Sequence, residues 1–103
     1  MRINKNFLKR FSLIKHYNIR VTGRVQGVGF RYSARSVARC HNIKGFVRNE
    51  PDGSVYIEAE GSEENLKEFI EWCKSGPVGG GINETIVSEG SIRNFNAFEI
   101  RFS

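Results

Sequence analysis

The chain has 103 residues, of which 39% are hydrophobic and 26% charged, and its formal net charge at pH 7 is +5. That length accommodates one domain with an ordinary core, and no apolar run approaches the about 20 residues that a membrane span needs. Its two cysteines are too few for a disulfide scaffold.

The charges are divided unevenly along the chain. Residues 1–49 contain twelve Lys and Arg and no acid, whereas residues 50–103 contain all eleven acids and only four Lys and Arg. Such an asymmetry predicts a face that attracts anions. Nucleic acid, an anionic lipid surface and a small phosphorylated substrate would all fit such a face, and charge alone does not choose among them.

Residues 1–14 are interpreted as a basic N-terminal extension, and residues 15–103 as the folded domain. The extension lacks the apolar stretch of about 7–15 residues that marks a secretory signal, so the sequence predicts a cytoplasmic protein. A packed or frayed terminus is the first interpretation of this segment, and a helix on a lipid surface is the alternative.

The first half of the domain predicts a strand, a loop and a helix. Residues 17–22 alternate apolar with polar side chains, which is typical of a strand. The three glycines of residues 23–29 predict a loop. From Phe30 to His41, apolar side chains recur at the spacing of a helix that buries one stripe.

A hairpin and a second helix are expected next. Residues 44–49 and 55–60 predict two strands, joined by the turn residues 51–53, in which proline presets φ and glycine allows positive φ. Ser62 is expected to cap a helix that ends at Gly76, because Ser accepts a hydrogen bond from the first turn and Gly-Pro stops the helix.

Two further strands are predicted at residues 85–89 and 98–102. The resulting order, βαββαβ with an extra C-terminal strand, favours an α+β fold of the ferredoxin-like type: an antiparallel-rich sheet with both helices on one face. The right-handed crossover rule places the first strand in the interior of that sheet.

The loop of residues 23–29 has features of an anion site. Glycines let the backbone approach a ligand, successive N–H groups can form an anion-binding nest, and the positive end of the next helix points at the same place. Arg31 lies in the first helical turn, where a cation is unfavourable for the helix itself, so a bound anion is the simplest explanation. The known nucleotide-binding loops do not match, and an ordinary tight turn stays open on this observation alone.

Two stretches resemble the signatures of the acylphosphatase family. They are Gly23-x-Val25-Gln26-Gly27-Val28-x-Phe30-Arg31, and Gly45-Phe46-Val47-Arg48-Asn49 followed by Gly53-x-Val55 and Gly61. Both are complete and in the correct order, and the gap between them fits one helix. The resemblance covers about residues 16–103.

The resemblance implies a ferredoxin-like fold and hydrolysis of acyl phosphates to carboxylate and inorganic phosphate. It places the catalytic arginine at Arg31 and the catalytic asparagine at Asn49, with no metal or organic cofactor. The residues that it implies for phosphate binding are Gln26, Gly27, Val28, Gly29, Phe30 and Arg31. Whether the Gln26 side chain folds the loop or is exposed stays open.

A non-catalytic phosphate- or anion-binding module and an RNA-binding module are the alternatives. RNA-recognition domains have the same βαββαβ order, but they stack bases on aromatic side chains of the central strands. Residues 44–47 are only a fragment of that signature, and the third strand offers Glu58 and Glu60 instead. We therefore expect a small acyl phosphate substrate, phosphate or sulfate-like anions at the loop, no nucleic acid or membrane partner, and a monomer.

The histidines and cysteines give no catalytic signature. His16 and His41 have no carboxylate or thiol partner at catalytic spacing in the sequence, so both are expected to be structural or surface residues. Cys40 and Cys73 are expected to be reduced thiols on the two helices.

Overall fold

The computed structural model describes residues 13–77 and 80–102. In chain order its elements are β1 (Ile14–Gly23), α2 (Phe30–Cys40), β2 (Lys44–Asn49), β3 (Val55–Ser62), α3 (Glu63–Ser75), β4 (Ile82–Gly90) and β5 (Phe98–Arg101). The predicted α+β class and element order are confirmed. The N-terminal extension predicted at residues 1–14 lies almost wholly outside the described residues.

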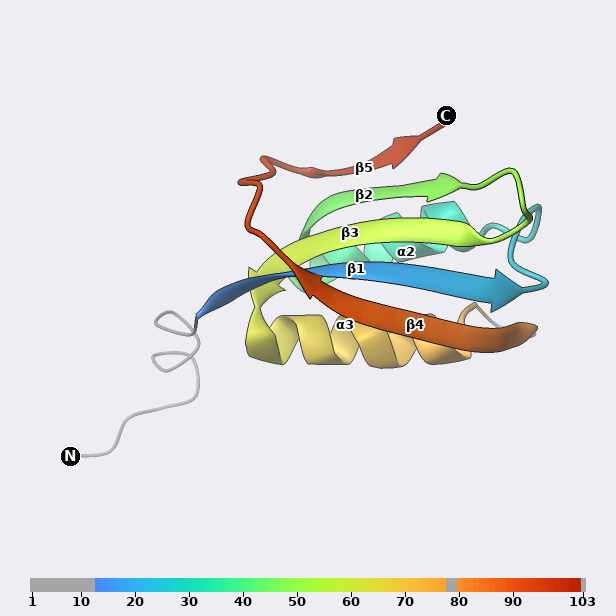
Figure 1. Cartoon of the computed structure of the whole chain (residues 1–103), viewed down its shortest axis with the longest axis horizontal. Coiled ribbons are helices and arrows are strands. Elements are labelled where there is room, and N and C mark those ends of the chain that lie inside the picture. Colours follow the sequence, from blue (N-terminus) through green and yellow to red (C-terminus); the bar gives the residue numbers. More distant parts are fainter. Residues whose placement is uncertain (1–12, 78–79, 103) are drawn as a thin grey trace.

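The five strands form one sheet in the order β4-β1-β3-β2-β5. β1 pairs antiparallel with β3 and β4, β2 pairs antiparallel with β3, and β5 runs parallel to β2. Both helices cover the same face of the sheet, as Figure 1 shows. The predicted ferredoxin-like arrangement is therefore confirmed, including the interior position of β1.

The core lies between the sheet and the two helices. Its fully buried members from the strands are Ile19, Val21, Val47, Val55, Ile57, Ala59 and Phe98, and those from the helices are Phe30, Ala34, Ala38, Leu66, Phe69 and Cys73. Alternate strand residues and every third or fourth helix residue therefore point inward, as the two periodicities predict. Full burial of one large apolar side chain stabilises the fold by about 1.5–3 kcal/mol.

The two ends of α3 are set by local chemistry. The Ser62 hydroxyl accepts a hydrogen bond from the N–H of Asn65 at 3.2 Å, which confirms the predicted cap of α3. Gly76 ends that helix with φ of 71°. Within residues 13–77 and 80–102, no helix is long and apolar enough to cross a membrane.

The cysteines occupy both helices, as predicted. Cys40 is exposed on α2, and Cys73 is buried in α3. Burial raises the pKa of the Cys73 thiol, because the thiolate would be charged in an apolar environment. Cys73 is therefore a core residue rather than a nucleophile.

Three strands are longer than their alternation predicts, and β3 gains only Gly61 and Ser62. β1 begins at Ile14, and β4 extends over Ile82–Gly90 rather than residues 85–89 alone. The two strands pair with each other from His16 opposite Gly90 to Gly23 opposite Ile82. Backbone pairing extends a strand wherever a partner is available, whatever the side-chain pattern.

Residues 91–97, here called the strap, connect β4 to β5 and cross the open face of the sheet (Figure 1). Three polar side chains beneath the strap are buried: His16 is 2% exposed, Glu58 7% and Glu60 4%. His16 Nδ1 lies 2.7 Å from Glu60 Oε2, and Nε2 lies 3.1 Å from Glu58 Oε1. The backbone N–H groups of Arg93 and Phe95 donate hydrogen bonds to the Glu60 carboxylate.

Both histidines thus have carboxylate partners that their spacing in the sequence did not reveal. The pairing of β1 with β3 places His16 directly opposite Glu60, 44 residues away in the chain. His41 Nε2 lies 3.0 Å from Glu68 Oε2 of the neighbouring helix. The expectation that both histidines are structural or surface residues fits these positions.

Acid is expected to destabilise the fold through Glu60. Burial raises the pKa of this carboxyl, but hydrogen bonds from the Arg93 N–H, the His16 ring and the Phe95 N–H outweigh burial and hold the pKa below its ordinary value. A carboxyl with a lowered pKa stabilises the folded state above its unfolded pKa, and this contribution is lost as the pH falls through the folded-state pKa. The free energy of unfolding should therefore decline once the pH falls below about 4.3.

Urea unfolding of the wild type and Glu60→Gln at a series of pH values checks this expectation. The variant has no carboxyl at this position, so its stability should depend less steeply on pH in the acid range. Equal acid slopes for the two proteins would assign the loss to other carboxyls.

Candidate active site

The two signatures meet at one end of the sheet. The loop after β1 and the turn between β2 and β3 lie beside each other at the right-hand end of Figure 1. The Gln26 amide joins them, because its Nε2 donates to the carbonyls of Glu50 at 2.8 Å and Ser54 at 2.9 Å. The Gln26 side chain therefore folds the loop, which resolves the alternative left open by the sequence.

The backbone of this loop presents N–H groups rather than side chains. Gly27 and Gly29 have φ of 77° and 79°, a left-handed conformation that residues with a Cβ rarely adopt. Between Gln26 and Tyr32, no N–H group donates a well-aligned hydrogen bond to a backbone carbonyl of the described residues, and the next such bond runs from Ser33 to Gly29 at 3.0 Å. These free donors, together with the positive end of α2, can bind an anion.

Arg31 lies in the first turn of α2 and is partly buried. Its Cζ lies 4.9 Å from the ring centroid of Phe102, within the range of a cation–π contact. No carboxylate of the described residues forms an ion pair with its guanidinium. Arg31 is thus held by an aromatic ring and keeps its charge available for a ligand.

Asn49 is the last residue of β2, and its Oδ1 is buried. This oxygen has no hydrogen-bond partner among the described residues. Leaving such an acceptor unpaired costs about 1–3 kcal/mol. Asn49 also lines a cavity of about 510 Å³ together with Arg48, Glu50, Pro51 and Phe102. Phe102 therefore lies beside both predicted catalytic residues, because it lines this cavity with Asn49 and contacts the guanidinium of Arg31.

The nearby acids are neutralised by arginines. The Arg48 Nε lies 3.1 Å from Glu50 Oε1, and Arg20 Nη1 lies 3.2 Å from Asp52 Oδ2. Hydrogen bonds from the hydroxyl and N–H of Ser54, with the charge of Arg20, hold the pKa of Asp52 below its ordinary value. These contacts fix the turn after Asn49 and limit repulsion of an anionic ligand.

The predicted phosphate-binding residues contribute in different ways. The Phe30 ring is buried in the core against Trp72, with ring centroids 5.1 Å apart, so only its N–H is free to bind. The Val28 side chain is exposed and its N–H belongs to the same row of donors. Sequence reasoning missed Phe102 as a neighbour of the site, because the sequence presented it only as the end of a strand.

Gln26→Ala is expected to lower both stability and phosphate affinity. The substitution removes two hydrogen bonds and leaves the carbonyls of Glu50 and Ser54 without these donors, which should cost about 1–2 kcal/mol in free energy of unfolding. Urea unfolding and inhibition by inorganic phosphate measure the two effects. Gln26→Met keeps the length of the side chain without the amide, so it should behave like Gln26→Ala. If both variants had the wild-type inhibition constant for phosphate, the Gln26 amide would have no role in shaping the loop.

Comparison with known proteins gives a consistent result. A family model described as Acylphosphatase matches residues 17–100. An acylphosphatase of Archaeoglobus fulgidus is 48% identical over 84 residues, which cover 82% of this chain and 94% of the relative. The crystal structure of acylphosphatase from Bacillus subtilis is similar with a TM-score of 0.82 and 39% identity, covering 86% of this chain and 99% of that chain.

A much longer protein also contains a similar region. A structure of full-length HypF in the phosphate- and nucleotide-bound form matches with a TM-score of 0.78 and 34% identity, covering 86% of this chain but 12% of the HypF chain. The family model covers most of the present chain, and the relatives from Archaeoglobus fulgidus and Bacillus subtilis are matched over nearly their whole length. The chain therefore belongs to the acylphosphatase family of hydrolases.

Proposed function

We propose that Arg31 and the loop N–H groups of residues 26–30 hold the phosphoryl group of an acyl phosphate, and that Asn49 positions the attacking water. The observation that carries this proposal is the buried Oδ1 of Asn49, which has no hydrogen-bond partner among the described residues and belongs to a residue that lines a cavity. The residue assignment is also supported by the Arg31 guanidinium, which has no ion-pair partner within residues 13–77 and 80–102, and by the N–H groups of the loop.

The chemistry of acyl phosphates suits so simple a site. The bond that breaks joins phosphorus to the oxygen of a carboxylate, whose conjugate acid has a pKa of about 4. This leaving group departs without a general acid. The phosphoryl transition state is loose and anionic, so catalysis consists mainly of positioning and charge stabilisation.

Each group has a defined part in the proposed reaction. The Arg31 guanidinium donates two parallel hydrogen bonds to phosphoryl oxygens, and the loop N–H groups hold the remaining charge. Asn49 orients the water in line with the leaving carboxylate. The oxygen of the water bonds to phosphorus, and the bond between phosphorus and the carboxylate oxygen breaks. One proton of the water passes to a phosphoryl oxygen and the other stays on the new hydroxyl, which gives carboxylate and inorganic phosphate.

We further propose that the protein works in the cytoplasm as a monomer, on a small-molecule acyl phosphate and without a cofactor. The N-terminal extension at residues 1–14 and the domain at residues 15–103 are part of this proposal. No general base is required, because the phosphate of the substrate accepts the proton.

Hydrolysis of benzoyl phosphate by the purified protein, with a chelator present, tests the proposed function. We expect fast turnover that the chelator does not diminish. No turnover above the spontaneous rate in a folded sample would overturn the proposal. Turnover that the chelator abolishes would overturn the cofactor-free mechanism alone.

A further inference from the structure

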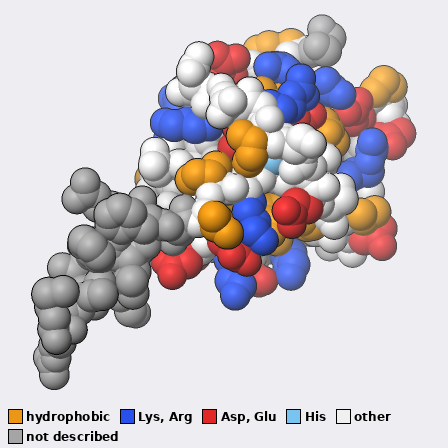
Figure 2. All heavy atoms as spheres, turned by 60° about the vertical axis from the view of Figure 1, so that its left-hand side comes forward, with side chains coloured by type: hydrophobic (Ala, Val, Ile, Leu, Met, Phe, Trp, Pro, Cys, Tyr) orange, Lys and Arg blue, Asp and Glu red, His pale blue; other side chains and the backbone are white. Residues whose placement is uncertain are grey.

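The cluster of His16, Glu58 and Glu60 lies near the start of β1, whereas the candidate active site follows its end. Figure 2 looks at this end of the molecule, where red and blue side chains both occur and several blue ones gather near the top of the view. The three side chains are nevertheless buried, and no step of the proposed reaction uses them. Buried ionisable groups are costly unless they are paired, so their arrangement calls for a physical explanation.

Both ring nitrogens of His16 face acceptor oxygens. Nδ1 lies 2.7 Å from Glu60 Oε2, and Nε2 lies 3.1 Å from Glu58 Oε1 and 2.9 Å from Asn18 Oδ1. A neutral imidazole has one N–H donor, and only the imidazolium has two. We propose that His16, when protonated, holds the strap of residues 91–97 against the open face of the sheet through Glu58 and Glu60. This pH-dependent contact is called the His16 pin below.

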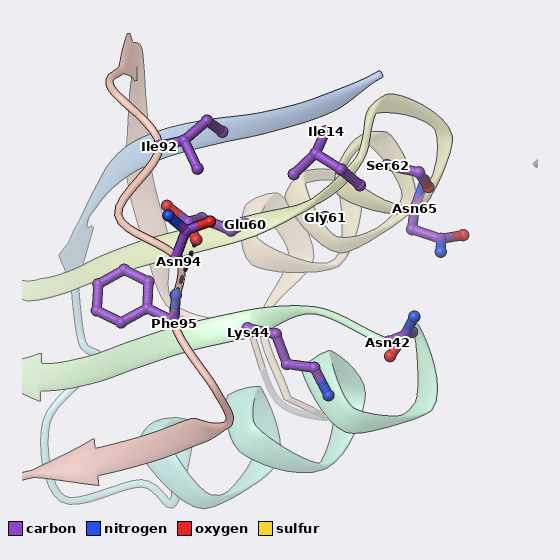
Figure 3. A pocket seen from close by; sticks show the side chains of 10 residues that line it. All are labelled: Ile14, Asn42, Lys44, Glu60, Gly61, Ser62, Asn65, Ile92, Asn94 and Phe95. Carbon is purple, nitrogen blue, oxygen red and sulfur yellow. Dashed lines mark hydrogen bonds between the residues drawn. The ribbon is translucent and has the colours of Figure 1, made fainter. Parts of the chain in front are cut away.

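The strap is attached to the same two carboxylates that His16 binds. The N–H groups of Arg93 and Phe95 donate to Glu60, and Figure 3 shows Glu60 and Phe95 facing each other across this contact. Arg93 Nη1 also lies 3.0 Å from Glu58 Oε1. The Phe95 ring stacks on the His16 ring with centroids 5.9 Å apart. The position of the strap therefore depends on the orientation of both carboxylates.

Other charged and titratable groups around the cluster do not replace the imidazolium. The Tyr56 hydroxyl donates to Glu58 Oε2 at 2.9 Å. Lys44 of β2 is in register with Glu60, and both line a cavity of about 470 Å³ shown in Figure 3. On β4 the residue opposite His16 is Gly90, which has no side chain. Lys15 pairs with carboxylates on α3 and β4 instead.

The sign of the pH effect follows from these contacts. When His16 loses its proton, one ring nitrogen becomes a lone pair facing an acceptor, and Glu58 and Glu60 lose the cation between them. Both carboxylates then repel each other in a buried environment. Histidine ordinarily changes charge between about pH 5 and 8. The contacts therefore hold the strap while His16 is protonated, and they weaken when the imidazolium loses its proton.

Loosening of the strap would reach the start of β5. The strap ends at Ala97, whose carbonyl accepts a hydrogen bond from the Gly45 N–H at 2.9 Å, and β5 begins at the next residue. The Gly45 amide therefore reports how far the release spreads.

Amide hydrogen exchange measured by NMR on the full chain tests the proposal. Protection factors correct for the intrinsic pH dependence of exchange. For the Arg93 and Phe95 amides they should fall about tenfold or more between about pH 5.5 and 8.5, because hydrogen bonds to charged groups are stronger than those between neutral groups. The fall should follow the titration of the His16 ring, which is observed in the same sample. Protection that stays flat while His16 titrates would overturn the proposal.

Two variants separate the pin from general pH effects. His16→Gln cannot be protonated, so strap protection should be low and nearly independent of pH. His41→Gln removes the other histidine, which lies on the helical side, and should keep the wild-type pH dependence. A wild-type profile in His16→Gln would also overturn the proposal. If His16→Gln does not fold, the pH dependence of the Arg93 and Phe95 amide chemical shifts in the wild type tests the proposal instead. The same pH midpoint for these shifts and for the His16 ring supports the proposal, and a different midpoint rejects it.

Discussion

Replacing Arg31 with alanine is expected to lower kcat for benzoyl phosphate by about 10²–10³-fold, the effect of losing one key oxyanion donor. The substitution removes the only side-chain cation that the proposed mechanism places on the phosphoryl group. Its charge is not used by any carboxylate of the described residues, so little of the loss should come from a broken ion pair. Steady-state kinetics on a sample shown to be folded by circular dichroism gives the measurement.

Arg35→Ala is the matched control for that experiment. Arg35 lies one turn later on α2, and its guanidinium stacks over Tyr32 at 5.4 Å. The control removes the same charge from the same helix, so a general electrostatic effect would appear in both variants. Near-normal turnover in folded Arg31→Ala, or an equal loss in both variants, would contradict the role of Arg31 as a phosphate clamp.

Asn49→Ala is expected to lower kcat by about 10²-fold while changing the inhibition constant of inorganic phosphate little. The expected rate loss arises because water is no longer oriented in line, and mispositioning of a reacting group costs about this much. Phosphate binding is assigned to Arg31 and the loop N–H groups, which the substitution leaves in place. Kinetics with phosphate as inhibitor separate the two quantities.

Asn49→Asp provides a second test at the same position. The carboxylate keeps an acceptor oxygen for the water but adds a negative charge beside the phosphoryl group. We therefore expect weaker phosphate inhibition in Asn49→Asp than in Asn49→Ala. Loss of phosphate inhibition in Asn49→Ala itself would make Asn49 a binding residue rather than a water-positioning residue.

Much of the fold is already implied by local patterns in the sequence. Residues 44–49 form β2 with the predicted bounds, and Ser62 caps α3 as expected. These features depend on side-chain periodicity and on capping chemistry, which act within a few residues. The ends of β4 were less predictable, because an edge strand lengthens through its pairing with β1 and not through its own alternation.

The candidate site was predictable only in part. The two signatures point to Arg31 and Asn49, whose roles stay a prediction until the substitutions are measured. The side-chain function of Gln26 could not be predicted, because its acceptors are backbone carbonyls 24 and 28 residues away. No local pattern marks Phe102, which lies next to Arg31 only because β5 pairs in parallel with β2.

The sequence by itself determined the order of the elements, the glycine loop, the two ends of α3 and the family resemblance. These depend on interactions between neighbours along the chain. Only the tertiary structure decided what Arg31, His16 and Asn49 face. Strand register and helix packing bring Phe102 to Arg31 and place His16 between two buried carboxylates. They also leave the Asn49 Oδ1 without a hydrogen-bond partner in the part of the chain that the structure describes. Such contacts join residues far apart in the chain, and their partners are selected by the packing of the whole sheet.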